Sequence, residues 1–176
     1  MNQFTHCTFP VGLAALLLVT GLGLASAADE PRAALRLPPG AGNPRNSEGD
    51  FIRLKDGRMM FVYTHFTDGA GDHSKAHLAA RYSSDAGKTW TTSDKVALRN
   101  EGDWNIMSVS LLRLDDGSIA LFYLRKNSLQ DCRPLLRRSI DEGKTWSKPT
   151  EIIKAPVGYY VMNNDRVVQL KKKRAA

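Results

Sequence analysis

An eight-residue pattern that occurs twice constrains the fold of this chain more than any other feature. Residues 83–90 and residues 139–146 both read S-x-D-x-G-x-T-W, and their aspartates, Asp85 and Asp141, stand 56 positions apart. A pattern with five fixed positions that recurs at such an interval indicates an internal structural repeat rather than a single site. We therefore expect two copies of one supersecondary unit.

The segments around the two patterns alternate between apolar runs and turn residues. Strands are expected at residues 51–54, 58–65 and 76–82, and again at 108–114, 118–125 and 135–139. In each repeat the first two strands flank an Asp-Gly pair, at Asp56 and at Asp116, which is a strong hairpin signal. One more strand after each pattern gives four antiparallel strands per repeat, as in a β-propeller blade. The chain is thus expected to be all-β.

We interpret each pattern as a tight turn. The Asp85 carboxylate is placed to accept backbone N–H groups that follow it, and Gly87 supplies a backbone angle that residues with a Cβ avoid. Trp90 adds a large ring that packs against the sheet. A catalytic role for the two aspartates is disfavoured, because catalytic residues are rarely duplicated at a structural period. The expected turn residues are Ser83, Asp85, Gly87, Thr89 and Trp90, and Ser139, Asp141, Gly143, Thr145 and Trp146.

The first 27 residues have the layout of a secretory signal peptide. An apolar run at 11–24 is followed by the small residues Ala25-Ser26-Ala27, so cleavage is expected after Ala27 and the protein is expected to be secreted or periplasmic. Residues 28–42 then form a linker. No later apolar segment is long enough to span a bilayer, so no stable membrane span is expected after signal removal.

The charge and the cysteines exclude several other functions. The net charge is +7, and Lys171-Lys172-Lys173-Arg174 in the basic tail 171–176 supplies four of the positive charges. The chain upstream has no basic stripe interleaved with aromatic residues, so no nucleic-acid partner is expected. Signal cleavage leaves Cys132 alone, which we expect to be an idle thiol. No metal site and no cofactor are expected, and the sequence does not indicate an oligomeric state.

The repeated pattern is the Asp-box, or BNR repeat, and over residues 43–170 the chain resembles the sialidase (neuraminidase) superfamily of six-bladed β-propellers. The resemblance implies a blade at about 43–95, a second at about 103–153, and the start of a third at about 158–170. It implies an exo-α-sialidase-like glycoside hydrolase that removes terminal sialic acid or a related acidic sugar from glycans. The alternative is a non-catalytic Asp-box propeller that binds carbohydrate or protein.

The order of the strands predicts which end of the blades carries the site. Both the Asp-boxes and the Asp-Gly turns fall at one end, so the loops between the second and third strands fall at the other. Sialidases place their site at that second end. By resemblance Asp72 is the acid/base that protonates the glycosidic oxygen, with Asp68 as the alternative. A plain turn role for both aspartates stays open.

The resemblance also implies a binding site for an acidic sugar. Arg45 is expected to pair with the substrate carboxylate, because a planar guanidinium binds a carboxylate through two parallel hydrogen bonds. Glu48 is expected either to orient Arg45 or to accept a sugar hydroxyl. Weaker candidates for substrate binding are Asn105, Arg125, Asn164, Asp165 and Arg166. Pairing between Asp165 and Arg166 is the structural alternative for those two residues.

The expected third blade stops after its first strand, so the chain corresponds to an N-terminal fragment of the family fold. The later arginines and the tyrosine nucleophile that sialidases use belong to blades beyond those expected here. Open blades also leave apolar faces and strand edges uncovered. The polypeptide alone is therefore expected to be inactive.

Overall fold

The computed structural model describes residues 33–170, which fold as strands and connecting loops with no helix among them. The signal peptide expected at 1–27, part of the linker and the tail 171–176 lie outside the described residues. The strands are β1 (Arg45–Arg53), β2 (Met59–Phe66), β3 (Ala76–Ser83), β4 (Lys95–Leu98), β5 (Asn105–Arg113), β6 (Ile119–Lys126), β7 (Cys132–Ser139) and β8 (Thr150–Glu151). The prediction of an all-β fold is confirmed.

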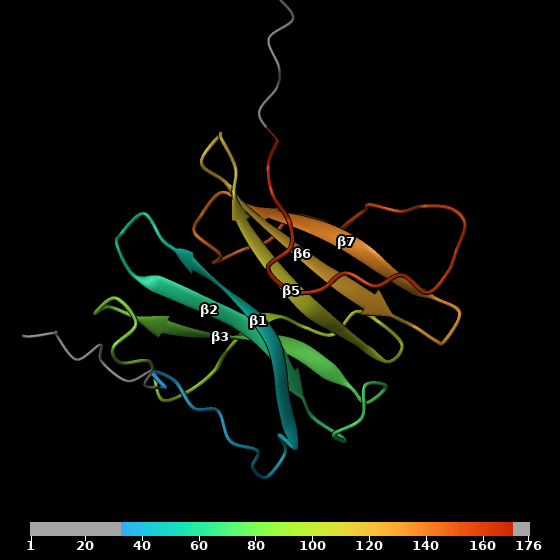
Figure 1. Cartoon of the computed structure of the whole chain (residues 1–176), viewed down its shortest axis with the longest axis horizontal. Coiled ribbons are helices and arrows are strands. Elements are labelled where there is room, and N and C mark those ends of the chain that lie inside the picture. The colour runs from blue at the N-terminus through green and yellow to red at the C-terminus, as the bar shows by residue number, and fades with distance from the viewer. Residues whose placement is uncertain (1–32, 171–176) are drawn as a thin grey trace, which may run out of the picture. The chain divides into compact units, whose positions relative to one another are not determined.

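The strands form two four-stranded antiparallel units, which we call blade 1 (β1–β4) and blade 2 (β5–β8). In each unit every strand pairs with the next one along the chain. A single parallel pair, Ala76 with Asn105, joins the two units. Figure 1 shows them as two groups of strands that lie against each other. This is the arrangement expected of neighbouring propeller blades.

The first strand of each blade carries a β-bulge at the same place. The register shifts between Ser47 and Gly49 in β1, and between Met107 and Ser110 in β5. Glu48 and Ser108 stand at these irregularities with positive φ angles of 25° and 60°. Because a bulge bends its strand and increases the twist, β1 and β5 depart from ideal pairing at the same level. The two blades therefore repeat each other in detail as well as in strand order.

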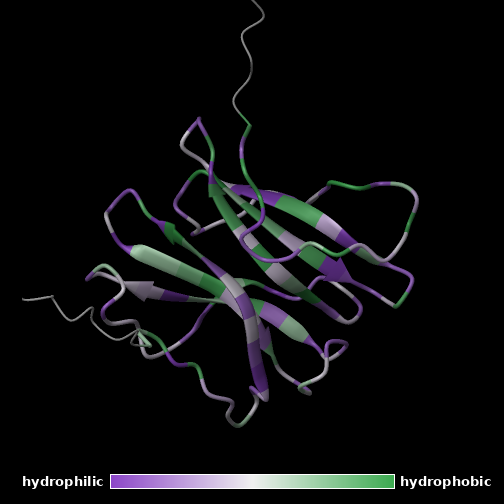
Figure 2. Cartoon of the chain, in the orientation of Figure 1, coloured by the Kyte–Doolittle hydropathy of each residue, from purple (hydrophilic) through white to green (hydrophobic). Residues whose placement is uncertain are grey.

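The core lies between the blades. Blade 1 presents one face of β1, β2 and β3, and blade 2 presents the facing side of β5, β6 and β7. Apolar colour accordingly runs along β2, β5 and β6 in Figure 2. The buried apolar residues of this interface are Ile52, Leu54, Met60, Val62, Leu78, Ala80, Ile106, Val109, Leu111, Ile119, Leu121, Tyr123 and Leu135. Burial of apolar surface between the blades is thus the main contribution to the free energy that holds them together.

Hydrogen bonds between first strands repeat from blade to blade. The Leu111 N–H of β5 donates to Asp50 Oδ2 of β1 at 2.7 Å. Ser110, which stands where Asp50 does in blade 1, accepts the Arg166 N–H at 3.3 Å. The Asp165 N–H donates to the Val109 carbonyl at 3.3 Å. The segment around 165 therefore lies along β5 much as β5 lies along β1.

The first strand of the expected third blade, within residues 158–170, is nevertheless not formed. A strand needs a ladder of backbone hydrogen bonds, and among the described residues this segment makes only isolated ones. Residues 158–170 contribute one bridge, from Tyr159 to Cys132. The expected start of a third blade is therefore an irregular segment in this structure.

Both S-x-D-x-G-x-T-W segments adopt the same turn. Asp85 Oδ1 accepts the Thr89 N–H at 2.8 Å, and Asp85 Oδ2 accepts the Thr89 hydroxyl at 2.7 Å. The second copy repeats these bonds between Asp141 and Thr145 at 2.9 Å and 2.6 Å. Hydrogen bonds from each threonine, followed by one from a serine hydroxyl, hold the pKa of Asp85 and of Asp141 at about 2.

Two further sequence features can be placed in this part of the chain. Cys132 is a buried free thiol at the start of β7, and its burial raises its pKa. Among residues 33–170 no helix is long and apolar enough to cross a membrane.

Candidate functional site

The loop 67–75 joins β2 to β3. It lies at the end of blade 1 opposite the Asp-Gly turn at Asp56 and the S-x-D-x-G-x-T-W turn at 83–90. Arg45 begins β1 at this end, because the strand register pairs it with Phe66, the last residue of β2. Asn105 begins β5 at the same end through its pairing with Ala76. The sequence placed Arg45, Glu48 and Asn105 in connecting segments, but all three lie on strands. Backbone pairing forms the strand here, so polar side chains do not prevent it.

Arg45 and Asp72 form an ion pair at this end. Arg45 Nη1 lies 2.5 Å from Asp72 Oδ1 and donates a second hydrogen bond to the Ala70 carbonyl at 3.0 Å. The guanidinium also lies over the Phe66 ring, 4.6 Å from its centroid. The Asp72 side chain is 59% exposed and that of Arg45 is 30% exposed, so a ligand in solution can reach both. The Arg45 hydrogen bond, and to a lesser degree its charge, lowers the pKa of Asp72.

Two buried side chains of blade 2 hold the backbone of the same loop. Asn105 Nδ2 donates to the carbonyls of Asp72 and Ser74, at 3.0 Å and 2.8 Å. Lys126 Nζ donates to the Asp72 carbonyl at 3.2 Å. Asn105 is fully buried and Lys126 is 1% exposed, so neither side chain is open to a ligand. The expectation that Asn105 binds substrate directly does not fit this burial; it contacts the loop instead.

The connection between the blades, residues 99–104, packs against the same loop. Lys75 Nζ donates to the Asp103 carbonyl, and the rings of His73 and Trp104 lie 4.5 Å apart. At Gly102 a Cβ would stand 2.5 Å from the Asn105 carbonyl oxygen, so only glycine fits there. The position of Asp72 is thus set by contacts to blade 2 as well as by its own blade.

Asp68 and Glu48 have different surroundings from Asp72. Asp68 Oδ1 accepts the Lys75 N–H at 2.6 Å, which closes the loop as a turn residue does. The Glu48 side chain is hydrogen-bonded to the Ser47 hydroxyl at 3.4 Å and not to Arg45. The structure therefore does not show Glu48 orienting Arg45.

The remaining sequence candidates are not gathered around Asp72. Arg125 Nη2 donates to Glu151 Oε1 at 2.9 Å, on the β8 side of blade 2. Asn164 Nδ2 donates to the Gly49 carbonyl at 3.3 Å. Asp165 and Arg166 contact β5 through their backbone N–H groups, and no ion pair joins their side chains in the described structure. In the described structure none of these four residues forms a hydrogen bond or an ion pair with the side chain of Asp72 or Arg45.

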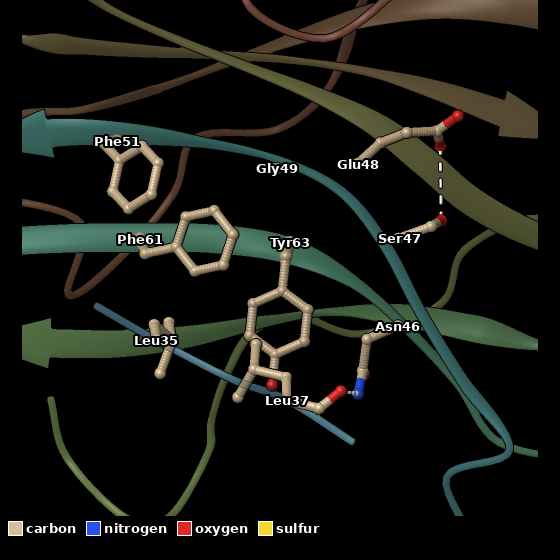
Figure 3. Close-up of a pocket in the computed structure, with 9 residues that line it drawn as sticks. All are labelled: Leu35, Leu37, Asn46, Ser47, Glu48, Gly49, Phe51, Phe61 and Tyr63. Carbon is tan, nitrogen blue, oxygen red and sulfur yellow. Dashed lines mark hydrogen bonds between the residues drawn. The ribbon is translucent and has the colours of Figure 1, made fainter. Parts of the chain in front are cut away.

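A separate hollow of about 330 Å³ lies on the outer face of blade 1 (Figure 3). Its floor is an aromatic stack in which the Phe51 and Phe61 rings are 4.4 Å apart and the Phe61 and Tyr63 rings are 5.3 Å apart. Leu35 and Leu37 lie beside these rings in Figure 3. Glu48 lines this hollow, whereas Arg45 and Asp72 do not. It is therefore distinct from the Arg45–Asp72 site.

Each blade also carries a polar network that the sequence patterns do not predict. The Tyr63 hydroxyl donates to Asp94 Oδ1 at 2.6 Å, and Arg81 Nε binds the same oxygen. In blade 2, Tyr123 and Arg137 both bind Glu101. The tyrosines and arginines recur at the repeat interval and were therefore detectable. The acidic partners were not, because one precedes β4 and the other lies in the connection between the blades.

No family model matches the sequence, and comparison with curated proteins finds no match. Similar solved structures include a protein of unknown function from Dyadobacter fermentans, with 19% identity and a TM-score of 0.57, over 72% of this chain and 42% of that one. A sialidase from Trypanosoma rangeli has 20% identity and a TM-score of 0.47, over 61% of this chain and 20% of that one. A glycosyl hydrolase from Bacteroides ovatus has 17% identity and a TM-score of 0.48, over 58% and 30%. The chain thus spans less than half the length of each of these structures.

Proposed function

We propose that the Arg45–Asp72 end of the blades is part of a sialidase-type site that binds terminal sialic acid or a related acidic sugar and hydrolyses it from glycans. The observation that carries the proposal is the 2.5 Å contact between Arg45 Nη1 and Asp72 Oδ1 at an exposed end of the fold. It combines a group suited to a carboxylate with a group suited to proton transfer. The Asp-box resemblance supports the same reaction class.

The ion pair gives Asp72 different properties before and after a sugar binds. Without a ligand, Arg45 keeps the pKa of Asp72 low, so Asp72 is an ionised carboxylate. A sugar carboxylate that binds Arg45 competes with Asp72 for the same guanidinium. Loss of that partner raises the pKa of Asp72. Protonated Asp72 then donates its proton to the glycosidic oxygen as the bond to the anomeric carbon breaks and a nucleophile, which in sialidases is a tyrosine, binds that carbon. The resulting Asp72 carboxylate accepts a proton from the water that afterwards displaces the nucleophile.

The proposal is tested by calorimetric titration of the full chain with N-acetylneuraminic acid. Arg45→Ala should abolish binding, whereas Asp72→Ala should retain or strengthen it, because Arg45 is then no longer occupied by an internal carboxylate. N-acetylglucosamine, which has no carboxylate, is the matched control ligand and should not bind. Equal affinity of the wild-type and Arg45→Ala proteins for N-acetylneuraminic acid would contradict the proposal.

A non-catalytic carbohydrate-binding propeller is the second candidate function. The lowered pKa of Asp72 favours it, because a general acid normally requires a raised pKa. A fluorogenic sialoside tests the catalytic candidate directly. Release of the fluorophore that Asp72→Ala abolishes supports the hydrolase and overturns the expectation that this polypeptide alone is inactive, whereas saturable binding without release agrees with both candidates.

A further inference from the structure

Lys126 is a buried lysine that lies next to the Arg45–Asp72 ion pair without being part of it. It ends β6 and is 1% exposed, and its Nζ lies over the Tyr159 ring, 5.1 Å from the centroid. Its hydrogen-bond acceptor is the Asp72 carbonyl at 3.2 Å. Within residues 33–170 no carboxylate forms an ion pair with it. Burial of a charge without a paired carboxylate costs free energy, so the Asp72 carbonyl and the Tyr159 ring must together stabilise the buried ammonium group.

Asn105 is buried beside the same carbonyl. Its Nδ2 donates to the carbonyls of Asp72 and Ser74, while its Oδ1 is buried without a partner in the described structure. Two donors from different strands of blade 2 therefore meet at the backbone oxygen of Asp72. A carbonyl oxygen has two lone pairs, and here both donors come from side chains that cannot move into solvent.

We propose that Lys126 and Asn105 are positioning residues, which fix the backbone of Asp72 so that its carboxylate meets Arg45. Asp72 lies in an exposed loop of blade 1, where its own blade does not restrict its backbone by strand pairing. The two donors supply that restriction from blade 2. The inference rests on the proposed function, because it names what keeps the acid/base in place. It also explains why the site requires the blades to pack together.

The charges that face Asp72 agree with this arrangement. Arg45 approaches from β1, Lys126 from β6, and His73 from the same loop, and each of them lowers the pKa of Asp72. Arg45 has the largest effect because it alone is hydrogen-bonded to the carboxylate. If the loop is released, that hydrogen bond loosens and the largest cause of the lowered pKa is lost.

The test is an NMR pH titration of the Asp72 carboxyl carbon in the full chain. Lys126→Met should shift the Asp72 titration upward, and Lys126→Arg, which keeps a buried cationic donor, should restore the wild-type midpoint. Asn105→Leu is a near-isosteric variant without charge, which removes both hydrogen bonds to the loop and leaves in place the Lys126 charge that also lowers the pKa of Asp72. It should shift the Asp72 titration upward, and this shift carries the test. Lys75→Met is the matched control, because it removes a loop ammonium that binds the Asp103 carbonyl instead; it should leave the Asp72 midpoint unchanged.

Thermal unfolding of each variant separates positioning from simple destabilisation. If Asn105→Leu lowers the unfolding temperature but leaves the Asp72 midpoint in place, the buried donors are structural and the inference is wrong. In titrations with N-acetylneuraminic acid, Lys126→Met should strengthen the affinity by roughly tenfold, because a loosened Asp72 leaves Arg45 free for the sugar carboxylate. A tenfold change is the equivalent of one hydrogen bond to a charged group. Absence of sugar binding by the wild type would contradict the proposed function alone, because the Asp72 titration needs no sugar.

Discussion

Glu142 accepts two hydrogen bonds from Arg113, from Nη1 to Oε1 at 2.6 Å and from Nη2 to Oε2 at 2.9 Å. The same carboxylate accepts the Lys55 N–H at 2.8 Å, and Lys55 belongs to the first turn of blade 1. Glu142 thereby connects the second S-x-D-x-G-x-T-W turn, in blade 2, to the hairpin of blade 1. The first such turn has Ala86 at the equivalent position, so the connection is specific to this pair of blades.

Glu142→Ala is expected to lower the free energy of unfolding by about 2 kcal/mol, because it removes hydrogen bonds to a charged group and leaves the Lys55 N–H without its acceptor. Glu142→Gln keeps one acceptor oxygen and should cost less. Urea denaturation monitored by tryptophan fluorescence measures both values. Lys144→Ala, an exposed change in the same turn, is the control and should stay within about 0.5 kcal/mol of the wild type. Equal stability of wild type and Glu142→Ala would show that the connection contributes nothing.

The same carboxylate predicts a loss of stability in acid. The hydrogen bond from Arg113 holds the pKa of Glu142 at about 2, below its ordinary value of 4.5. A group whose pKa is lowered by folding stabilises the protein above its unfolded pKa and loses that contribution as the pH falls through the folded value. Stability should therefore decrease between pH 4.5 and about pH 2. In urea titrations across this range, Glu142→Gln should show a shallower decrease than the wild type.

Gly102→Ala should disturb the connection between the blades. A Cβ at this position would lie 2.5 Å from the Asn105 carbonyl oxygen and 2.8 Å from that of Lys126, and both atoms are backbone. The expected cost is about 1–3 kcal/mol, typical of overpacking. Gly40→Ala is the matched control, because a Cβ there meets nothing within 4 Å. A Gly102→Ala protein as stable as Gly40→Ala would show that the connection moves freely.

Asp85→Ala and Asp141→Ala should destabilise their turns without affecting sugar binding. Each aspartate accepts hydrogen bonds from the following threonine, and each lies at the end of its blade opposite Asp72. Lower urea midpoints together with an unchanged affinity for N-acetylneuraminic acid are expected. Abolished sugar binding in a variant that remains folded would instead indicate a functional role for these aspartates.

Much of the fold was predictable because its signals are local. The Asp-Gly pairs and the repeated pattern specify turns through contacts within a few residues, and they locate six of the strands. The first two thirds of β1, residues 45–50, were missed, since these polar residues become a strand only by pairing with β2. The start of the third blade shows the opposite error. A strand was expected within residues 158–170, but the described chain offers this segment no strand with which to form a ladder of hydrogen bonds.

The candidate site likewise contains residues that were expected from the sequence and one that only the tertiary structure reveals. Asp72 and Arg45 were expected from the resemblance to sialidases, and the structure brings them together across 27 positions of sequence. Lys126 was not detectable, because at the end of β6 it reads as an ordinary exposed lysine. The repeat by itself determined the strand order and the turns, and the resemblance added the end of the blades at which a site is expected. Only the packing of blade 2 against blade 1 decided which donors are buried beneath Asp72, because contacts between distant residues exist only once the apolar faces have met.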